Sequence, residues 1–246
     1  MAISAEVGGL IPQAWKFAKE YMSQFDPSHD FSHLQRVVSL AQVIYDSSTP
    51  QFQSNCDRNL ITLLALLHDV GDKKYATVSR GKVEVENFLL SLNVPKDLAA
   101  HVQHLVSNVS FSNEQKNKKY VQDLATKYPE LAVVQDADRL DAIGAIGIAR
   151  VITYGVLKQP QLGWQGVVDH YEEALRKIAS EMKTVEGKKI AESRGERIRI
   201  FFEDWWNDEV WSPTPFWPPL PAPSPHQNFT TQMGIGRVES SQSDCL

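Results

Sequence analysis

Residues 58–71, RNLITLLALLHDVG, form a strongly apolar run that ends on a histidine and an aspartate. The run predicts a buried helix from about Arg58 to Asp69, and Gly71 is a natural stop after it. A buried His68-Asp69 pair needs partners, because an unpaired charge in such a place is costly. A cation would satisfy both side chains, and the partial negative charge at the carbonyl end of a helix favours one.

A second helical pattern places another histidine on a buried face. The helix is expected to start at Asp26-Pro27, which suit the N-cap and first positions, and to run to about Tyr45. Its buried stripe is His33, Val37, Leu40, Ala41 and Ile44. For a lone histidine, a hydrogen bond to a backbone carbonyl would be the better interpretation. The His-Asp pair at 68–69 makes a shared metal site the stronger hypothesis.

The run VVQDADRLDAIGAIGIAR, residues 133–150, adds carboxylates to a third helix. Asp138 and Asp141 fall on a mostly apolar stripe, where a solvated face is not expected. A cluster of charges at a helix N-terminus, together with Asp136, explains them about equally well. Both interpretations stay open for this run taken alone.

The rest of the domain is also helical in pattern, so the expected fold class is all-α. Further helices are expected over residues 10–24, 81–92, 95–109, 114–128, 130–157, 165–181 and 186–208. In the long segment 130–157, Gly144 and Gly147 lower helix propensity, and close packing or a kink would explain them. No alternation of period two persists long enough to build a sheet.

Composition changes near Val210. The segment that follows begins WSPTPFWPPLPAPSP and is rich in proline and serine, which excludes a helix or a central strand. We therefore expect one helical domain, residues 1–210, and an extended or disordered tail, residues 211–246, that catalysis does not need. A proline-rich ligand for another protein is the alternative use of the tail.

Charge and cysteine content exclude several classes of protein. The net charge of −5 does not suggest a nucleic-acid polymer as partner. The only cysteines, Cys56 and Cys245, are too few for a disulfide framework or a cysteine-based zinc site. No secretory signal and no apolar run of membrane length is evident. We expect a cytoplasmic or nuclear protein without a membrane partner, and its oligomeric state, including a homodimer, stays open.

The three runs together supply two imidazoles and two carboxylates: His33, His68, Asp69 and Asp138. This mixture favours manganese, with Mg, Co, Ni, Fe and Zn as the alternatives. Four protein ligands leave coordination positions open for water and a phosphate oxygen. The metal can then lower the pKa of the water and neutralise charge on a phosphoryl group.

Three short segments of the sequence resemble the HD-domain superfamily of metal-dependent phosphohydrolases: SHDFSHLQRV, ALLHDVGDKKY and QDADRLDAIGAIGIAR. In particular, they resemble the branch of small HD hydrolases that includes the YpgQ-like nucleotide pyrophosphohydrolases, over roughly residues 10–205. By this resemblance His33 is the first ligand, His68 and Asp69 form the motif that names the superfamily, and Asp138 is the final aspartate. The resemblance implies hydrolysis of a small phosphorylated molecule, foremost a nucleotide. The products would be a monophosphate and pyrophosphate from a triphosphate, or orthophosphate from a monophosphate.

The resemblance also assigns roles around the metal. Asp72 matches an acidic position of related nucleotidases and is expected to act as general base, with helix capping as its alternative. Asp69 is expected to serve catalysis as well as metal binding. The expected substrate-binding residues are Arg36, Lys74, Arg139 and His29.

Several of these residues have a second interpretation. Arg36 shares a helix face with His33 and can pair with Asp138 instead. His29 can belong to a capping cluster at the start of its helix. Arg194 lies in a C-terminal segment that also resembles the family. It could contact the substrate or tether helices, and the sequence does not separate these two roles.

Two alternatives to a phosphohydrolase remain. His101 and His104 are spaced i, i+3 and would bind a second metal in a di-iron oxygenase of the HD type, although an ordinary polar helix face is the interpretation we favour. A non-catalytic nucleotide-binding domain with the same fold is the other alternative. All four ligand positions are intact, which argues against it.

Overall fold

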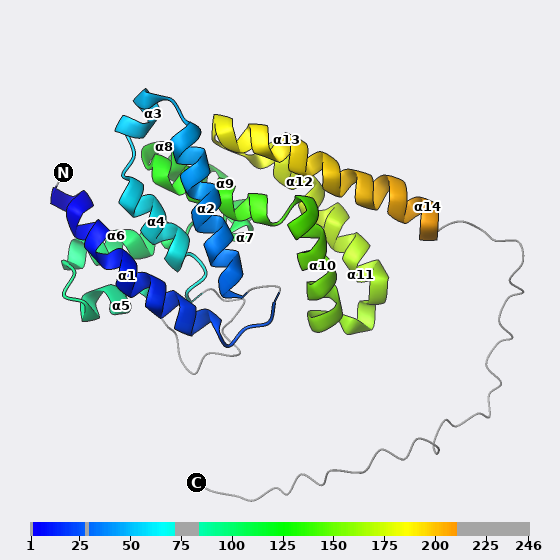
Figure 1. Ribbon diagram of the computed structural model, residues 1–246, viewed down its shortest axis with the longest axis horizontal. Coiled ribbons are helices and arrows are strands. Elements are labelled where there is room, and N and C mark those ends of the chain that lie inside the picture. The colour runs from blue at the N-terminus through cyan, green and yellow to red at the C-terminus, as the bar shows by residue number, and fades with distance from the viewer. Residues whose placement is uncertain (1, 28–29, 72–83, 211–246) are drawn as a thin grey trace, which may run out of the picture. The chain divides into compact units, whose positions relative to one another are not determined.

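The computed structural model describes residues 2–27, 30–71 and 84–210, and every regular element in these ranges is helical (Figure 1). The all-α fold class is confirmed. The described helices belong to one packed unit that ends at Val210. The tail, residues 211–246, lies outside the described residues, so its predicted role stays a prediction.

The helices follow one another along the chain as α1 (Ala2–Met22), α2 (Phe31–Ser47), α3 (Pro50–Ser54), α4 (Arg58–Leu67), α5 (Val85–Ser91), α6 (Lys96–Val106), α7 (Phe111–Lys116), α8 (Lys118–Lys127), α9 (Pro129–Asp141), α10 (Gly144–Lys158), η2 (Pro160–Leu162), α11 (Gly163–His170), η3 (Tyr171–Leu175), α12 (Arg176–Ile178), η4 (Ala179–Glu181), α13 (Val185–Arg199), η5 (Ile200–Trp206) and α14 (Asn207–Val210). The two short turns η2 and η4 are 3-10 helices, and η3 and η5 are π-helical. The short helix α3 was not predicted.

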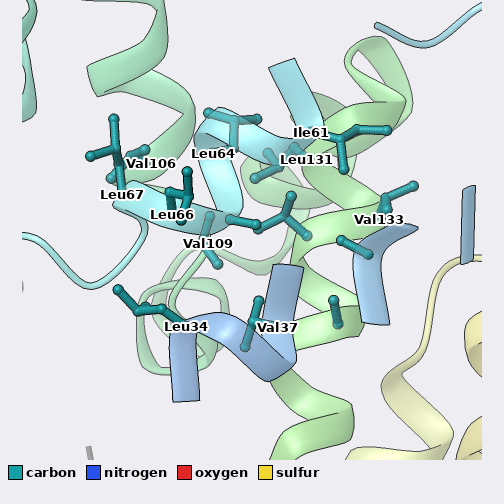
Figure 2. Packing of buried hydrophobic residues seen from close by; sticks show 14 of the residues in the cluster. Leu34, Val37, Ile61, Leu64, Leu66, Leu67, Val106, Val109, Leu131 and Val133 are labelled. Carbon is teal, nitrogen blue, oxygen red and sulfur yellow. The ribbon is translucent and has the colours of Figure 1, made fainter. Parts of the chain in front are cut away.

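Helix α4 lies in the middle of the core, where α1, α2 and α9 pack against it. Figure 2 shows its side chains among residues of α2 and α9: Ile61, Leu64, Leu66, Leu67, Leu34, Val37, Leu131 and Val133. All of these are fully buried, and burying one such side chain stabilises the fold by roughly 1.5–3 kcal/mol. The core therefore fixes α4 in place, and with it the two polar residues that follow.

The end of α4 agrees with the sequence to within two residues. The helix stops at Leu67 rather than Asp69, and His68 is its C-cap. Gly71 has a φ of +74°, the left-handed conformation that glycine adopts readily, at the predicted stop. His68 and Asp69 thus stand in the turn after the helix, with their backbone held by the core.

Helix α2 starts four residues later than predicted. Its N-cap is Asp30, whose carboxylate accepts hydrogen bonds from the backbone N–H of His33 at 3.3 Å and from the Ser32 hydroxyl. Asp26 forms an ion pair with Lys158 at 2.8 Å instead. Both aspartates have the side chain of a good cap, so the local sequence did not distinguish them.

The single helix predicted over residues 130–157 is two helices, α9 and α10, bent by 69°. Gly144 starts α10 with a φ of +74°, where a side chain would be strained. A Cβ on Gly147 would lie 2.3 Å from the carbonyl oxygen of Ala142, across the break. The kink that these glycines suggested is confirmed, and it turns Arg150 of α10 back toward Asp141 at the end of α9.

Within the described residues, no single helix has both the length and the apolar composition of a membrane span. The bent pair of α9 and α10 meets these two criteria only when both helices are counted together.

Candidate metal centre

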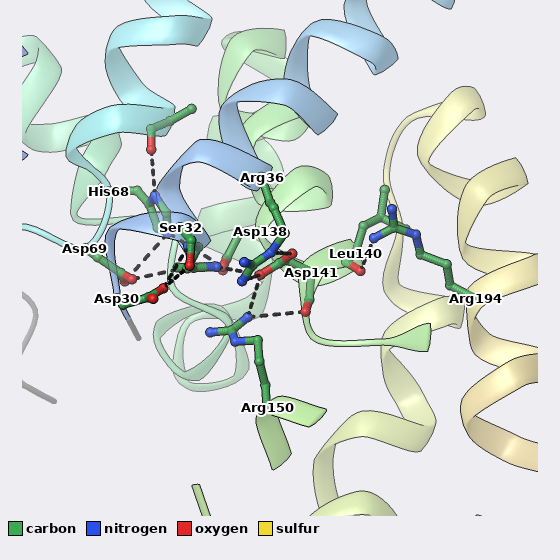
Figure 3. Close-up of polar contacts among 12 residues, drawn as sticks. Asp30, Ser32, Arg36, His68, Asp69, Asp138, Leu140, Asp141, Arg150 and Arg194 are labelled. Carbon is green, nitrogen blue, oxygen red and sulfur yellow. Dashed lines mark hydrogen bonds and ion pairs between the residues drawn. The ribbon is translucent and has the colours of Figure 1, made fainter. Parts of the chain in front are cut away.

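Three segments bring the four predicted ligands together: α2 supplies His33, the turn after α4 supplies His68 and Asp69, and α9 supplies Asp138. Figure 3 labels the last three of these side chains. The Nε2 atom of His33 lies 3.4 Å from a carboxylate oxygen of Asp69 and 3.4 Å from one of Asp138. The Nε2 atom of His68 lies 3.6 Å from an oxygen of each. These separations are longer than ordinary hydrogen bonds, so the four groups face a common point without bonding strongly to one another.

This arrangement fits a divalent cation. Donor atoms about 2.1 Å from one ion stand roughly 3.0–3.4 Å apart, close to the separations in the cluster. The ligand atoms of His33, His68 and Asp138 all lie within 4.8 Å of one another. The buried Nε2 of His68 has no hydrogen-bond partner among the described residues. A buried polar atom without a partner costs free energy, and a bound cation would remove that cost.

The other ring nitrogens orient both imidazoles toward that point. The Nδ1 of His68 lies 2.9 Å from the carbonyl oxygen of Ala65, and the Nδ1 of His33 lies 2.8 Å from a carboxylate oxygen of Asp141. Both partners are acceptors, so each Nδ1 carries the hydrogen and donates it. In the neutral rings, the lone pair is then on Nε2, the form that binds a metal.

The charges in the cluster favour a positive partner. Burial lowers the pKa of His68, but the carboxylates of Asp69 and Asp138 outweigh burial and raise that pKa to about 9. Burial raises the pKa of Asp138, but the neighbouring imidazoles of His33 and His68 hold it well below the ordinary value. Without a cation, the carboxylates would therefore retain a proton on His68, and a cation would compete with that proton.

Asp141 is a site residue for which the sequence predicted no role. Its carboxylate is 1% exposed and accepts from Nδ1 of His33, from Nε and Nη2 of Arg36 at 2.7 and 2.9 Å, and from Nη1 of Arg150 at 3.0 Å. Burial raises its pKa, but the bonds from His33 and Arg36 lower it overall. The available signal was its i+3 spacing from Asp138, which places it on the same side of α9.

Arg36 pairs with Asp141, not with Asp138 as its alternative role proposed. It bonds to the carboxylate that holds the Nδ1 of His33, whereas the facing ligand atoms lie on the Nε2 side. This pairing helps to orient His33 through Asp141, and the predicted substrate contact of Arg36 stays a prediction.

The predicted substrate contact of Arg139 is wrong. Its side chain is 1% exposed and donates to the carboxylate of Glu114, which also accepts from Lys183 at 2.9 Å. The Arg139 guanidinium also lies over the ring of Phe111. A guanidinium enclosed in this way cannot meet a substrate phosphate.

The three aspartates of α9 are not a cluster at a helix N-terminus, because α9 begins at Pro129. Asp136 accepts from the backbone N–H groups of Lys183 and Thr184 and from the Thr184 hydroxyl, the last two at 2.7 Å. It thereby fixes the start of α13, while Asp138 and Asp141 serve the metal centre.

His101 and His104 contact tyrosines, not the four predicted ligands. The Nε2 of His104 is 3.1 Å from the hydroxyl of Tyr120, and the His101 ring packs against Tyr128. Within the described part of the chain, neither joins the group of side chains that can hold a metal. The polar helix face is therefore the better account of this pair.

Three predicted site residues, His29, Asp72 and Lys74, lie outside the described residues. Their roles in base catalysis and substrate binding stay predictions.

Several known proteins are similar to this chain in sequence and in fold. Residues 30–143, which contain all four ligands, match the model of the HD domain family. YpgQ of Bacillus subtilis (strain 168) is 33% identical over 169 residues, which cover 68% of this chain and 77% of YpgQ. The crystal structure of YpgQ in complex with ADP has a TM-score of 0.63 at 25% identity and covers 83% of this chain and 96% of that one. An HD-superfamily hydrolase from Bacillus thuringiensis has a TM-score of 0.58 at 28% identity and covers 82% and 98%.

Proposed function

This chain belongs to the HD-domain family, and on that premise we propose that it is a metal-dependent phosphohydrolase acting on a small phosphorylated molecule, foremost a nucleotide. One observation carries the proposal. Two imidazole nitrogens and two carboxylates converge at 3.4–3.6 Å, and the Nε2 of His68 has no partner among the described residues.

His33, His68, Asp69 and Asp138 would hold the cation. A divalent metal bound there supplies Lewis acidity, which lowers the pKa of water and offsets negative charge on a phosphoryl group. Manganese is our first choice because the site mixes imidazole with carboxylate, and Mg, Co, Ni, Fe and Zn are the alternatives.

Residues around the ligands supply the remaining functions. Asp141 fixes the tautomer and the orientation of His33. Arg150 donates to the same Asp141 oxygen that His33 contacts, so its positive charge stands beside the first ligand. Arg150 therefore helps Arg36 to hold the carboxylate that orients His33. Asp72 remains the proposed general base, three residues after Asp69.

The first candidate reaction is hydrolysis of a nucleoside triphosphate at its α-phosphorus. Water adds to phosphorus, the bond to the bridging oxygen breaks, and a monophosphate and pyrophosphate leave. The similarity to YpgQ, whose structure holds ADP, supports a nucleotide substrate. Release of orthophosphate from a nucleoside monophosphate is the second candidate.

A substrate screen on the purified full chain tests this function. Nucleoside triphosphates and monophosphates would be offered with Mn, Mg, Co or Ni, with separate detection of pyrophosphate and orthophosphate and elemental analysis of the protein. We expect metal-dependent release of pyrophosphate. Nucleotide binding without hydrolysis by any metal form would support the non-catalytic domain, and two irons per chain with oxygen uptake would support the oxygenase.

A further inference from the structure

An open cleft of about 440 Å³ lies next to the metal centre, between helices that the sequence did not place together. One wall is the side of α2 that runs from Ser32 to Val43. Opposite are Ile146, at the start of α10, and Arg194 of α13. Both arginines donate to the end of α9: Arg36 to the carboxylate of Asp141, and Arg194 to the carbonyl of Leu140 (Figure 3).

The cleft is separate from the metal centre. None of the four ligand residues lines it, whereas Asp141 does. Asp141 contacts the Nδ1 of His33, and the ligand cluster uses the Nε2 on the other side of that ring. An occupant of the cleft would therefore touch the network that orients the first ligand without entering the metal centre.

Positive charge exceeds negative charge in this cleft. Two arginines and one carboxylate line it, and Arg150 shares that carboxylate from outside. Arg194 donates to the Leu140 carbonyl at 2.7 Å and has no carboxylate within ion-pair distance among residues 2–27, 30–71 and 84–210. A half-buried guanidinium that donates to a backbone carbonyl and lies beside a second arginine is a good partner for an anion.

The remaining lining is apolar and accessible. Val43 is 50% exposed and Ile146 is 42% exposed, and Leu40 lies beside them. Exposed aliphatic side chains next to paired arginines suit a ligand with an anionic end and an apolar or aromatic body. The volume falls within the range of small-molecule sites, roughly 300–1,000 Å³.

We propose that this cleft is a second ligand site, which binds a phosphorylated small molecule with its phosphate at Arg36 and Arg194 and its body against Val43 and Ile146. The site does not require the proposed hydrolysis, because it uses none of the metal ligands.

Binding of AMP and of inorganic phosphate to the full chain, freed of cations with a chelator, tests this site by calorimetry. The key variants are Arg194→Gln, which removes one of the two cleft arginines, and Gln35→Glu, which adds a negative charge on the exposed cleft wall of α2. Gln122→Glu makes the same change on the exposed face of α8 and is the matched control. His68→Ala disables the metal centre and shows whether AMP binds elsewhere.

We expect AMP to bind more tightly than inorganic phosphate, because only AMP reaches the apolar wall. Arg194→Gln should weaken AMP binding about tenfold or more, which corresponds to the loss of one charge-assisted contact. Gln35→Glu should weaken it by a smaller factor, and Gln122→Glu and His68→Ala should leave it unchanged. Unchanged binding in both cleft variants, equal affinity for AMP and phosphate, or loss of binding in His68→Ala would overturn the proposal.

Discussion

Helix α9 carries two buried groups of charged side chains, and they are balanced in different ways. On one side, Arg139 and Asp136 meet Glu114 of α7 and Lys183 before α13. On the other side, Asp138 meets His33, His68 and Asp69. The first group, which we call the internal ion cluster, contains two carboxylates and two cations. The second has two carboxylates and two imidazoles, and in the metal-free fold its positive charge comes from a proton on His68.

The distances follow from the charge balance. In the internal ion cluster, Lys183 lies 2.9 Å from Glu114, and the backbone N–H of Thr184 lies 2.7 Å from Asp136. In the second group, which we call the metal cluster, the facing atoms stay 3.4–3.6 Å apart. Buried carboxylates need positive partners, so the internal ion cluster is balanced by its own cations, whereas a bound cation would complete the other cluster. This comparison separates a structural polar cluster from a ligand site without reference to any relative.

The largest expected effect is on the metal cluster. Asp69→Ala should abolish cation binding and reduce turnover by at least roughly 10³-fold, because several kcal/mol of charge stabilisation depend on the cation. Helix content, measured by circular dichroism, should change little. Asp123→Ala, on the exposed face of α8, is the matched control. Full metal-dependent activity in Asp69→Ala would show that the centre is misplaced.

The second effect is on the internal ion cluster. Glu114→Gln should lower the free energy of unfolding by about 3–5 kcal/mol, because it leaves Arg139 and Lys183 buried without their carboxylate. Urea unfolding measures this loss, and the cation affinity of the folded protein should not change. The control is Glu181→Gln, whose ion pair with Lys118 is partly exposed and should be worth about 0–1 kcal/mol. Equal losses in the two variants would contradict the comparison.

Asp141 tests whether the metal cluster also depends on its supporting carboxylate. Asp141→Asn should weaken cation binding about 10–100-fold, because an amide no longer fixes the tautomer of His33. Competition with a fluorescent chelator measures the affinity. Asp46→Asn removes the exposed partner of Arg58 at the far end of α2 and should leave the affinity unchanged. An unchanged affinity in Asp141→Asn would mean that His33 is oriented by other contacts.

The last effect is a pH dependence of stability that His68 should give to the metal cluster. The carboxylates raise the pKa of His68 to about 9 in the metal-free fold, above its ordinary value near 6.5. The protonated ring therefore stabilises the metal-free protein fully below about pH 6.5, and this contribution, roughly 3 kcal/mol for a shift of this size, is lost as pH rises through 9. Cation affinity should rise over the same window, since the cation displaces the proton.

Urea unfolding of the metal-free chain, repeated in roughly half-unit steps of pH from about 6 to about 9.5, measures this dependence. In His68→Ala the slope should be flat over that window. The same slope in wild type and variant would assign the proton to another group.

Much of the fold and the four ligands could be predicted because their signals are local. The apolar run before His68 and the stripe around His33 are helical patterns that the core preserves. The start of α2 was misplaced because Asp26 and Asp30 are equally good caps, and the pairing of Asp26 with Lys158 decides between them. Spacing within one helix carries no such information.

The roles of charged neighbours could not be predicted, because their partners are distant in sequence. Asp141 lies 105 residues from Arg36, and Glu114 lies 25 residues from Arg139. Arg139 and Asp138 are adjacent in the chain, yet they point into different clusters because successive residues of a helix lie about 100° apart. The segments that resemble the family therefore predicted which side chains meet at the candidate metal centre, but they did not predict the contacts of Arg139.

By itself, the sequence determined an all-helical domain and four side chains able to share a cation, since helix periodicity and ligand chemistry are properties of short segments. Only the tertiary structure decided that Asp141 supports the first ligand, that Arg139 is enclosed by Glu114, and that a cationic cleft opens beside α2. The physical reason is that charge compensation in a low-dielectric interior depends on which groups meet in space, and that is settled by the packing of helices.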